Sequence, residues 1–224
     1  VCKATGEPLA KIAARVMVGQ TMKQQGVKVE VTPKYMCVKE AVFPFTKFLG
    51  VDPVLGPEMR STGEVMGVGA SFGEALYKAE LGAGDRLPEK GTAFISVRDV
   101  DKARAVSVAT HLRDQGFNIV ATRGTAALLQ HAAIPCRVVN KVSEGRPNVV
   151  DMIKNGDVQL VIATADESRT QISDARQIRQ TALAQLGVVY YTTISGAAAA
   201  VEGQKHAKDV EVRSLQELHA MNRA

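Results

Sequence analysis

The chain has 224 residues, of which 46% are hydrophobic, so it can bury a core in one large domain or two smaller ones. Its formal net charge is +5, but the Lys and Arg residues are scattered, Trp is absent and aromatic residues make up only 4%, which leaves few platforms for base stacking. A binder of small anions explains the charge equally well, so we expect no nucleic-acid partner.

Neither the cysteines nor the histidines are spaced for a metal site or a disulfide framework. The three cysteines form no C-x-x-C pair and are odd in number, and the four histidines are isolated from one another. We therefore predict no metal site and expect reduced, mostly buried thiols. No apolar run has the length of a membrane span and the N-terminus lacks the pattern of a signal peptide, so we expect no membrane contact and a cytoplasmic location.

The first third of the chain mixes helical and strand patterns. Apolar residues at helical spacing from Leu9 predict a helix that ends near Gly19, and alternation over residues 38–43 predicts a strand. Residues 51–67 are rich in Gly and Pro, so we expect them to form a loop.

A capping-box pattern follows that loop. Ser71 and Glu74 have the spacing that satisfies two free amides at a helix start, and the helix is predicted to run to about Leu81. These elements are too few to enclose a core of their own. We therefore interpret residues 1–88 as the incomplete α+β tail of a larger domain, and residues 89–224 as a second domain.

In the second domain, short β-rich runs alternate with segments of helical periodicity. Strands are expected over residues 92–97, 117–121, 137–139, 158–163 and 188–191. Helices are expected over residues 126–133, from Pro147 to about residue 155, and over residues 169–186. Three more are expected to start after Asp101, which would act as the cap, at Ser195 and at Ser214. This α/β alternation, with right-handed crossovers, predicts an open parallel sheet flanked by helices on both faces.

Polar side chains follow the ends of these predicted strands. They are Lys102, Thr122, Thr125, Lys141, Thr164 and Thr192. Ligands of open parallel sheets bind at the carboxyl ends of strands, where helix N-termini present N–H groups to anions. Each residue alone is as readily a helix cap or a solvated lysine, but together they favour a phosphate or carboxylate site. No Ser-His-Asp set or paired acid and base accompanies them, so we predict binding and name no catalytic residue.

Four motifs of the chain match a known family. They read V-K-E at residues 38–40, G-V-D-P-V-L-G-P-E-M-R-S-T-G-E-V-M-G at 50–67, A-T-R-G-T at 121–125 and V-N-K-V-S-E-G-R-P at 139–147. Over essentially its whole length the chain resembles the C-terminal part of the large subunit of carbamoyl phosphate synthase. The resemblance implies that residues 1–88 end the second ATP-grasp half and that residues 89–224 form an allosteric domain similar in fold to methylglyoxal synthase.

The resemblance also implies a function for the parent protein. The family is a ligase that makes carbamoyl phosphate from bicarbonate and glutamine-derived ammonia with ATP, for pyrimidine and arginine biosynthesis. Its ATP and Mg sites would lie upstream of Val1 in a chain several times longer, so we expect no cofactor and no synthase activity in these residues alone. Implied partners are the rest of the large subunit and the glutaminase small subunit, and a homo-oligomer through the allosteric domain is left open.

Two effector sites follow from the same resemblance. In bacterial members the allosteric pocket holds the phosphate of UMP or IMP, at positions that correspond here to Lys102, Thr122, Thr125 and Lys141, with Thr164 at the next strand end. Glu40 and Thr192 match positions that bind the activator ornithine at the seam between the two domains.

The chain departs from the family pattern at both sites. Ala163 and Ala165 replace an amide and a hydroxyl that would help to hold a nucleotide, which leaves open which effector binds. Tyr191 replaces an Asp before Thr192, which removes a partner for the ammonium group of ornithine.

An alternative function is an independent lyase like methylglyoxal synthase, acting on dihydroxyacetone phosphate. Those enzymes place a catalytic Asp where this chain has Gly145-Arg146-Pro147, so the general base is missing. A nucleic-acid module would bind with steep salt dependence, but the scattered charge argues against it.

Overall fold

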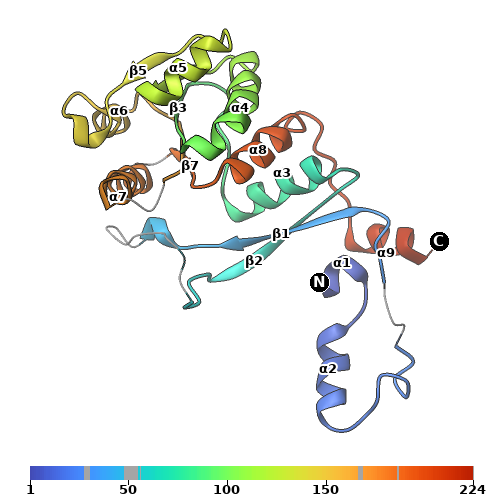
Figure 1. Cartoon of the computed structure of the whole chain (residues 1–224). Coiled ribbons are helices and arrows are strands. Elements are labelled where there is room, and N and C mark those ends of the chain that lie inside the picture. Colours follow the sequence, from blue (N-terminus) through green and yellow to red (C-terminus); the bar gives the residue numbers. More distant parts are fainter. Residues whose placement is uncertain (28–30, 48–54, 56, 166–168, 186, 224) are drawn as a thin grey trace.

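The structure is a computed structural model that describes residues 1–27, 31–47, 55, 57–165, 169–185 and 187–223. Its larger body, at the upper left of Figure 1, is a parallel sheet of five strands flanked by helices. The strands are β3 (Thr92–Ser96), β4 (Asn118–Thr122), β5 (Arg137–Val139), β6 (Leu160–Ala163) and β7 (Val189–Tyr191). All five predicted strands are present.

The strands lie in the order β5-β4-β3-β6-β7, and neighbouring strands run parallel. The chain moves outward from β3 through β4 to β5 and then returns to the other side of β3 with β6. Where connections leave two adjacent strands in opposite directions, a crevice opens between their carboxyl ends, and ligands of open α/β sheets bind there. The order therefore places the crevice between β3 and β6.

Helices cover both faces of this sheet. They are α4 (Lys102–Asp114), α5 (Arg123–His131), α6 (Val149–Lys154), α7 (Arg169–Ala184) and α8 (Ile194–Gln204). Successive side chains of a strand point to opposite faces. Ala93 and Ile95 accordingly pack in one core cluster with α4, α5 and α8, whereas Phe94 packs in a second cluster with α6 and α7. The predicted open sheet with helices on both faces is confirmed.

One predicted helix start is confirmed and one is wrong in detail. Asp101 is the N-cap residue of α4, as predicted, but its side chain makes no capping hydrogen bond, and its carboxylate accepts the Nε–H of Arg98 at 2.7 Å instead. Pro147 lies before α6 rather than in its first turn. Asn148 is the cap, and its side chain accepts the N–H of Val150 at 3.0 Å. An Asn side chain can satisfy a free helix amide and a proline cannot, so the helix starts after Asn148.

The first third of the chain forms a small antiparallel unit. Its elements are α1 (Cys2–Thr5), α2 (Leu9–Met17), β1 (Met36–Val42), β2 (Gly63–Gly69) and α3 (Phe72–Ala83). β1 and β2 pair as two antiparallel strands, and α3 packs on them. The predicted helix near Leu9, the strand within residues 36–42 and the helix after Ser71 are present.

The prediction that residues 51–67 form a loop is wrong for residues 63–67, which belong to β2; residues 51–54 and 56 lie outside the described part of the chain. Gly67 has a packing reason in this strand. A Cβ atom there would lie 1.8 Å from the carbonyl oxygen of Ala75. The absent side chain lets α3 lie directly on the strand, so this glycine serves close packing and not a turn.

The two predicted capping boxes differ. At Ser214 the box is complete, because the Ser214 hydroxyl accepts the N–H of Glu217 and the Glu217 carboxylate accepts the N–H of Ser214. At Ser71 only the first half forms. The Ser71 hydroxyl accepts the N–H of Glu74 at 3.2 Å, but the Glu74 carboxylate accepts the N–H of Ala70 instead.

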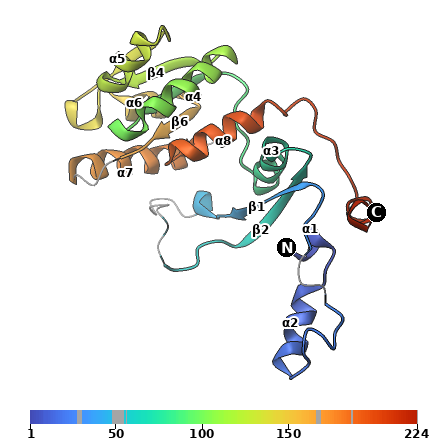
Figure 2. The same cartoon turned by 45° about the vertical axis from the view of Figure 1, so that its right-hand side comes forward.

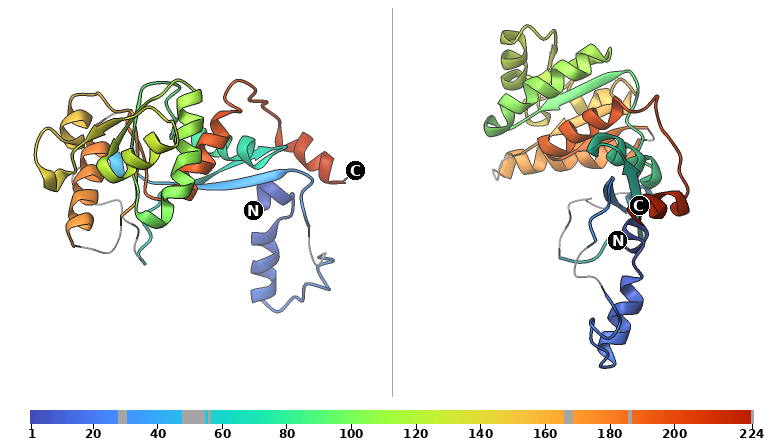
Figure 3. Two further views of the ribbon diagram at one scale, coloured as in Figure 1. Left: turned by 45° about the horizontal axis from the view of Figure 1, so that its top comes forward. Right: turned by 90° about the vertical axis from the view of Figure 1, so that its right-hand side faces the viewer.

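α3 connects the small unit to the parallel sheet, since it packs on β1, β2 and α8 (Figure 1). α1 lies beside α9 (Leu215–Arg223), away from the parallel sheet (Figures 2 and 3), and His219 donates to the carbonyl oxygen of Lys3 at 2.8 Å. The proposed division of the chain after residue 88 stays a prediction.

Candidate functional site

A cavity of about 260 Å³ lies at the carboxyl ends of β3, β4 and β6. Its lining includes all five residues that the sequence assigned to effector phosphate binding, which are Lys102, Thr122, Thr125, Lys141 and Thr164. They come from the carboxyl ends of four different strands and the segments that follow them, with Thr122 as the last residue of β4. The cavity is at the reversal of strand order, where the topology predicts a ligand crevice.

Two of the three threonines hold the loop after β3 in place, and the third bonds to the last residue of β3. Thr125 accepts the N–H of Val97 at 3.3 Å, and Thr164 accepts the N–H of Arg98 at 3.0 Å. Thr122 shares a hydrogen bond of 3.1 Å with the Ser96 hydroxyl. A hydroxyl that accepts from an amide keeps its own O–H proton to donate. Thr125 can therefore offer a donor to an anion while it fixes the loop, whereas the Thr164 hydroxyl already forms a hydrogen bond that lowers the pKa of Asp101.

The two lysines supply positive charge at the mouth of the cavity. Lys102 begins α4, and its ammonium lies 2.7 Å from the carboxylate of Asp99. This hydrogen bond lowers the pKa of Asp99, and Lys141 lowers it further. Gly124 lies beside Lys102, since a Cβ atom there would be in ordinary contact with the Lys102 Nζ, at 3.9 Å. An anion in the cavity would therefore compete with Asp99 for the Lys102 ammonium.

The cavity also holds acidic residues that the sequence analysis did not assign. Asp99 precedes Lys102 by three residues, and this spacing on one helical turn could have predicted their ion pair. Asp174 comes from α7 and accepts the hydroxyl and the N–H of Ser143 at 2.7 and 3.3 Å. Only the fold brings α7 to this cavity, so no local pattern could have identified Asp174.

A second cavity, of about 640 Å³, is lined by β1, α3 and β7. It contains Glu40 and Thr192, the two positions assigned to ornithine, together with Glu80, Asp85 and Tyr191. Burial raises the pKa values of Glu40 and Asp85, and it raises the pKa of Glu80 to about 7. The surroundings of this cavity are therefore acidic and partly dehydrated, which favours a cationic ligand.

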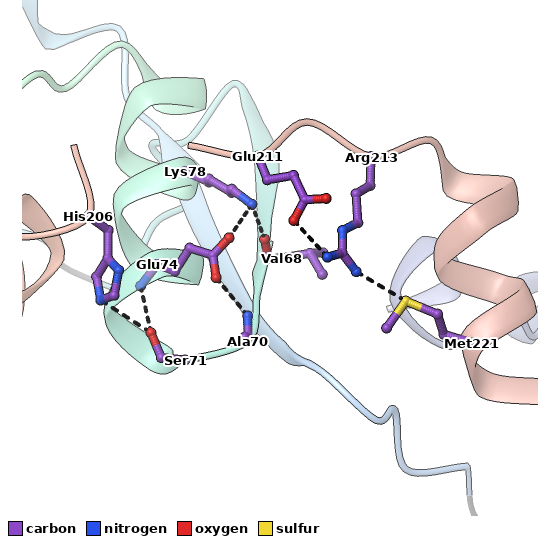
Figure 4. A network of polar contacts seen from close by, with 9 residues as sticks. All are labelled: Val68, Ala70, Ser71, Glu74, Lys78, His206, Glu211, Arg213 and Met221. Atoms are coloured by element: carbon purple, nitrogen blue, oxygen red, sulfur yellow. Dashed lines mark hydrogen bonds and ion pairs between the residues drawn. The ribbon is translucent and has the colours of Figure 1, made fainter. Parts of the chain in front are cut away.

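A third cavity, of about 420 Å³, lies between α3 and the segment before α9 (Figure 4). Four of its charged groups form two ion pairs: Lys78 lies 2.6 Å from Glu74, and Arg213 lies 2.6 Å from Glu211. Its remaining walls are largely apolar. We assign it no ligand.

Other sequence expectations concern metals, thiols and membranes. In the residues that the structure describes, no three His, Cys, Asp or Glu side chains gather to hold a metal ion. Cys2, Cys37 and Cys136 are free but only partly buried, so the expectation of mostly buried thiols is wrong. Among the described helices none has the length and apolar character to cross a membrane.

Comparison with known proteins agrees with the motifs. Residues 104–192 match the family described as the MGS-like domain. The chain is 63% identical over 220 residues to the carbamoyl phosphate synthase large chain of Ralstonia nicotianae, 52% identical over 219 residues to that of Pasteurella multocida, and 55% identical over 219 residues to that of Xanthomonas campestris pv. campestris. Each match covers 98% of this chain and 20% of the relative, so the chain spans one fifth of the length of these relatives.

Proposed function

We propose that this chain, which is similar to carbamoyl phosphate synthase large chains over 98% of its length, is a regulatory module that binds a nucleoside monophosphate such as UMP or IMP. The parent protein would be the ATP-dependent ligase of pyrimidine and arginine biosynthesis. It would work in the cytoplasm with the rest of the large chain and a glutaminase subunit, and its ATP and Mg sites would lie outside these residues. The chain alone would make no carbamoyl phosphate.

One observation carries the proposal: five side chains, from the carboxyl ends of four strands and the segments that follow them, converge on one cavity at the strand-order reversal. Lys102 and Lys141 would neutralise the phosphate charge, and hydroxyl donors would bind its oxygens. Thr125 lies in the first turn of α5, where free helix amides also favour an anion. These groups together can recognise a phosphate without any catalytic residue.

The second cavity would bind ornithine through Glu40 and Thr192. It would lie at the seam between the proposed domains, residues 1–88 and 89–224. The hydrogen bond between Tyr191 and Glu80 and the packing of α3 on α8 join the two parts. A ligand shifts a conformational equilibrium only when it binds the two states unequally, so contacts across the seam could transmit effector binding to the synthase.

Isothermal titration calorimetry of the folded chain with UMP, IMP and ornithine tests the proposal. We expect heat from at least one nucleotide and from ornithine, and no heat from any of the three would refute it. The lyase alternative predicts methylglyoxal formation from dihydroxyacetone phosphate. Residues 145–147, where a catalytic Asp would be needed, contain no carboxylate and do not line the cavity, so we expect no turnover in that assay.

A further inference from the structure

Glu80 is a buried carboxylate on α3 that the sequence analysis did not single out. Its residue surface is 8% exposed, and it lines the seam cavity with Glu40 and Thr192. One carboxylate oxygen, Oε1, accepts the hydroxyl of Tyr191 at 3.1 Å. Tyr191 occupies the position where the family pattern has an Asp, and Glu80 is the carboxylate that its hydroxyl contacts in the same cavity.

The groups that face Glu80 make its surroundings negative. Glu40 on β1 and Asp85 after α3 both act on its carboxyl group electrostatically, and Tyr191 on β7 is the hydrogen-bond donor. Arg86 lines the same cavity, but within the described part of the chain Glu80 forms no ion pair with it or with any other cation. A buried carboxylate without a cationic partner is costly in free energy, and a bound cation would relieve that cost.

Resting on the ornithine site proposed above, we infer that Glu80 binds the terminal ammonium group of a cationic amino acid in the seam cavity, and that this binding releases a proton from Glu80. The proton passes from the Glu80 carboxyl group to solvent. The ammonium group keeps its own protons and pairs with the carboxylate that results. Glu80 thus takes over the role of the Asp that Tyr191 replaces.

Proton release follows from the pKa of Glu80. Burial, together with the negative charges of Glu40 and Asp85, raises this pKa to about 7, whereas the hydrogen bond from Tyr191 opposes the rise. About half of the Glu80 side chains therefore carry a proton at pH 7. Because the ligand binds the ionised form, its apparent affinity falls roughly tenfold between pH 8 and pH 6.

The test is calorimetric titration of the 224-residue chain with L-ornithine at pH 6, 7 and 8, with L-norvaline as the analogue that lacks the terminal ammonium group. For the wild type we expect affinity for ornithine to fall as pH falls, and a binding heat that depends on the ionisation enthalpy of the buffer. Glu80→Gln should bind ornithine roughly tenfold more weakly at pH 8 and lose most of the pH dependence. Norvaline should bind the wild type and the variant equally weakly.

Tyr191→Phe provides a second variant with a different signature. Loss of its hydroxyl removes a hydrogen bond that lowers the pKa of Glu80, so the pH profile should shift to higher pH while affinity well above the shifted pKa remains near that of the wild type. UMP binding reports that each variant is folded.

The outcomes separate the two proposals. Ornithine affinity that is independent of pH, or equal in the wild type and Glu80→Gln, overturns the role of Glu80 but leaves the seam site standing. A wild type that binds UMP but not ornithine at pH 8 refutes the seam site itself, and the role of Glu80 with it.

Discussion

Replacement of Lys102 by alanine removes one of the two lysine ammonium groups from the proposed phosphate cavity. Hydrogen bonds to charged groups contribute about 1.5–3 kcal/mol, and the partly exposed position of Lys102, 30% for its side chain, favours the lower half of that range. A loss of about 2 kcal/mol corresponds to a roughly 30-fold increase in Kd for the nucleotide. Loss of the competing ion pair with Asp99 offsets only a minor part of this, a few-fold in Kd at most, because Asp99 is 90% exposed.

Calorimetric titration with UMP measures this change, and Lys205→Ala is the matched control. Lys205 also pairs with an acid three residues away, Glu202 at 2.6 Å, but it lies at the end of α8 and does not line the cavity. We expect weaker UMP binding in Lys102→Ala alone, with ornithine binding unchanged in both variants. UMP affinity in Lys102→Ala within about twofold of the wild type would refute the assignment of Lys102 to the phosphate.

Three further predictions follow from individual contacts. Asp99→Asn should tighten UMP binding a few-fold in the same titration, because Asp99 competes with the phosphate for the Lys102 ammonium, and unchanged or weaker binding would contradict that competition. Gly67→Ala should lower the free energy of unfolding by about 2 kcal/mol or more, because its Cβ would collide with the backbone of α3. In the control Gly63→Ala, in the same strand, the new Cβ meets no atom within 4 Å, so the free energy of unfolding should change little. The pKa of Glu80 rises from its ordinary value of 4.5 to about 7 in the folded chain. Between these two values the folded chain holds a proton that the unfolded chain releases, so the stability that this group contributes is lost as the pH rises from 4.5 to about 7. Thermal melts should therefore show that the melting temperature falls less between pH 5 and pH 8 in Glu80→Gln than in the wild type. An equal fall in both proteins would show that Glu80 titrates normally.

Local sequence patterns predicted the strands of the parallel sheet well, because a buried strand such as residues 158–163 is a short apolar run between turn signals. They did not predict the strand order, which depends on which strands pair in the folded chain. β2 was missed for a different reason. Gly67 and its neighbouring glycines have the composition of a loop, but here glycine permits close contact with α3, and only the tertiary structure distinguishes these two uses.

In the candidate site, too, some residues could be predicted from local sequence patterns and others only from the tertiary structure. Residues at or soon after the predicted strand ends, such as Lys102 and Thr122, could be selected from sequence because the carboxyl ends of parallel strands share one edge. Asp174 and Glu80 could not be, since each lies on a helix that reaches its cavity only through packing. Glu80 and Tyr191 are 111 residues apart in the chain. The sequence therefore showed that the Asp expected at position 191 was missing, but not which carboxylate lies near that position.

The most direct test of the central proposal is a crystal structure of the chain grown with UMP or IMP. We predict that the phosphate group lies in the cavity at the carboxyl ends of β3, β4 and β6, within hydrogen-bond distance of the Lys102 and Lys141 ammonium groups and of the Thr122 and Thr125 hydroxyls. A nucleotide bound elsewhere on the chain, with this cavity empty at saturating nucleotide concentration, would contradict the account.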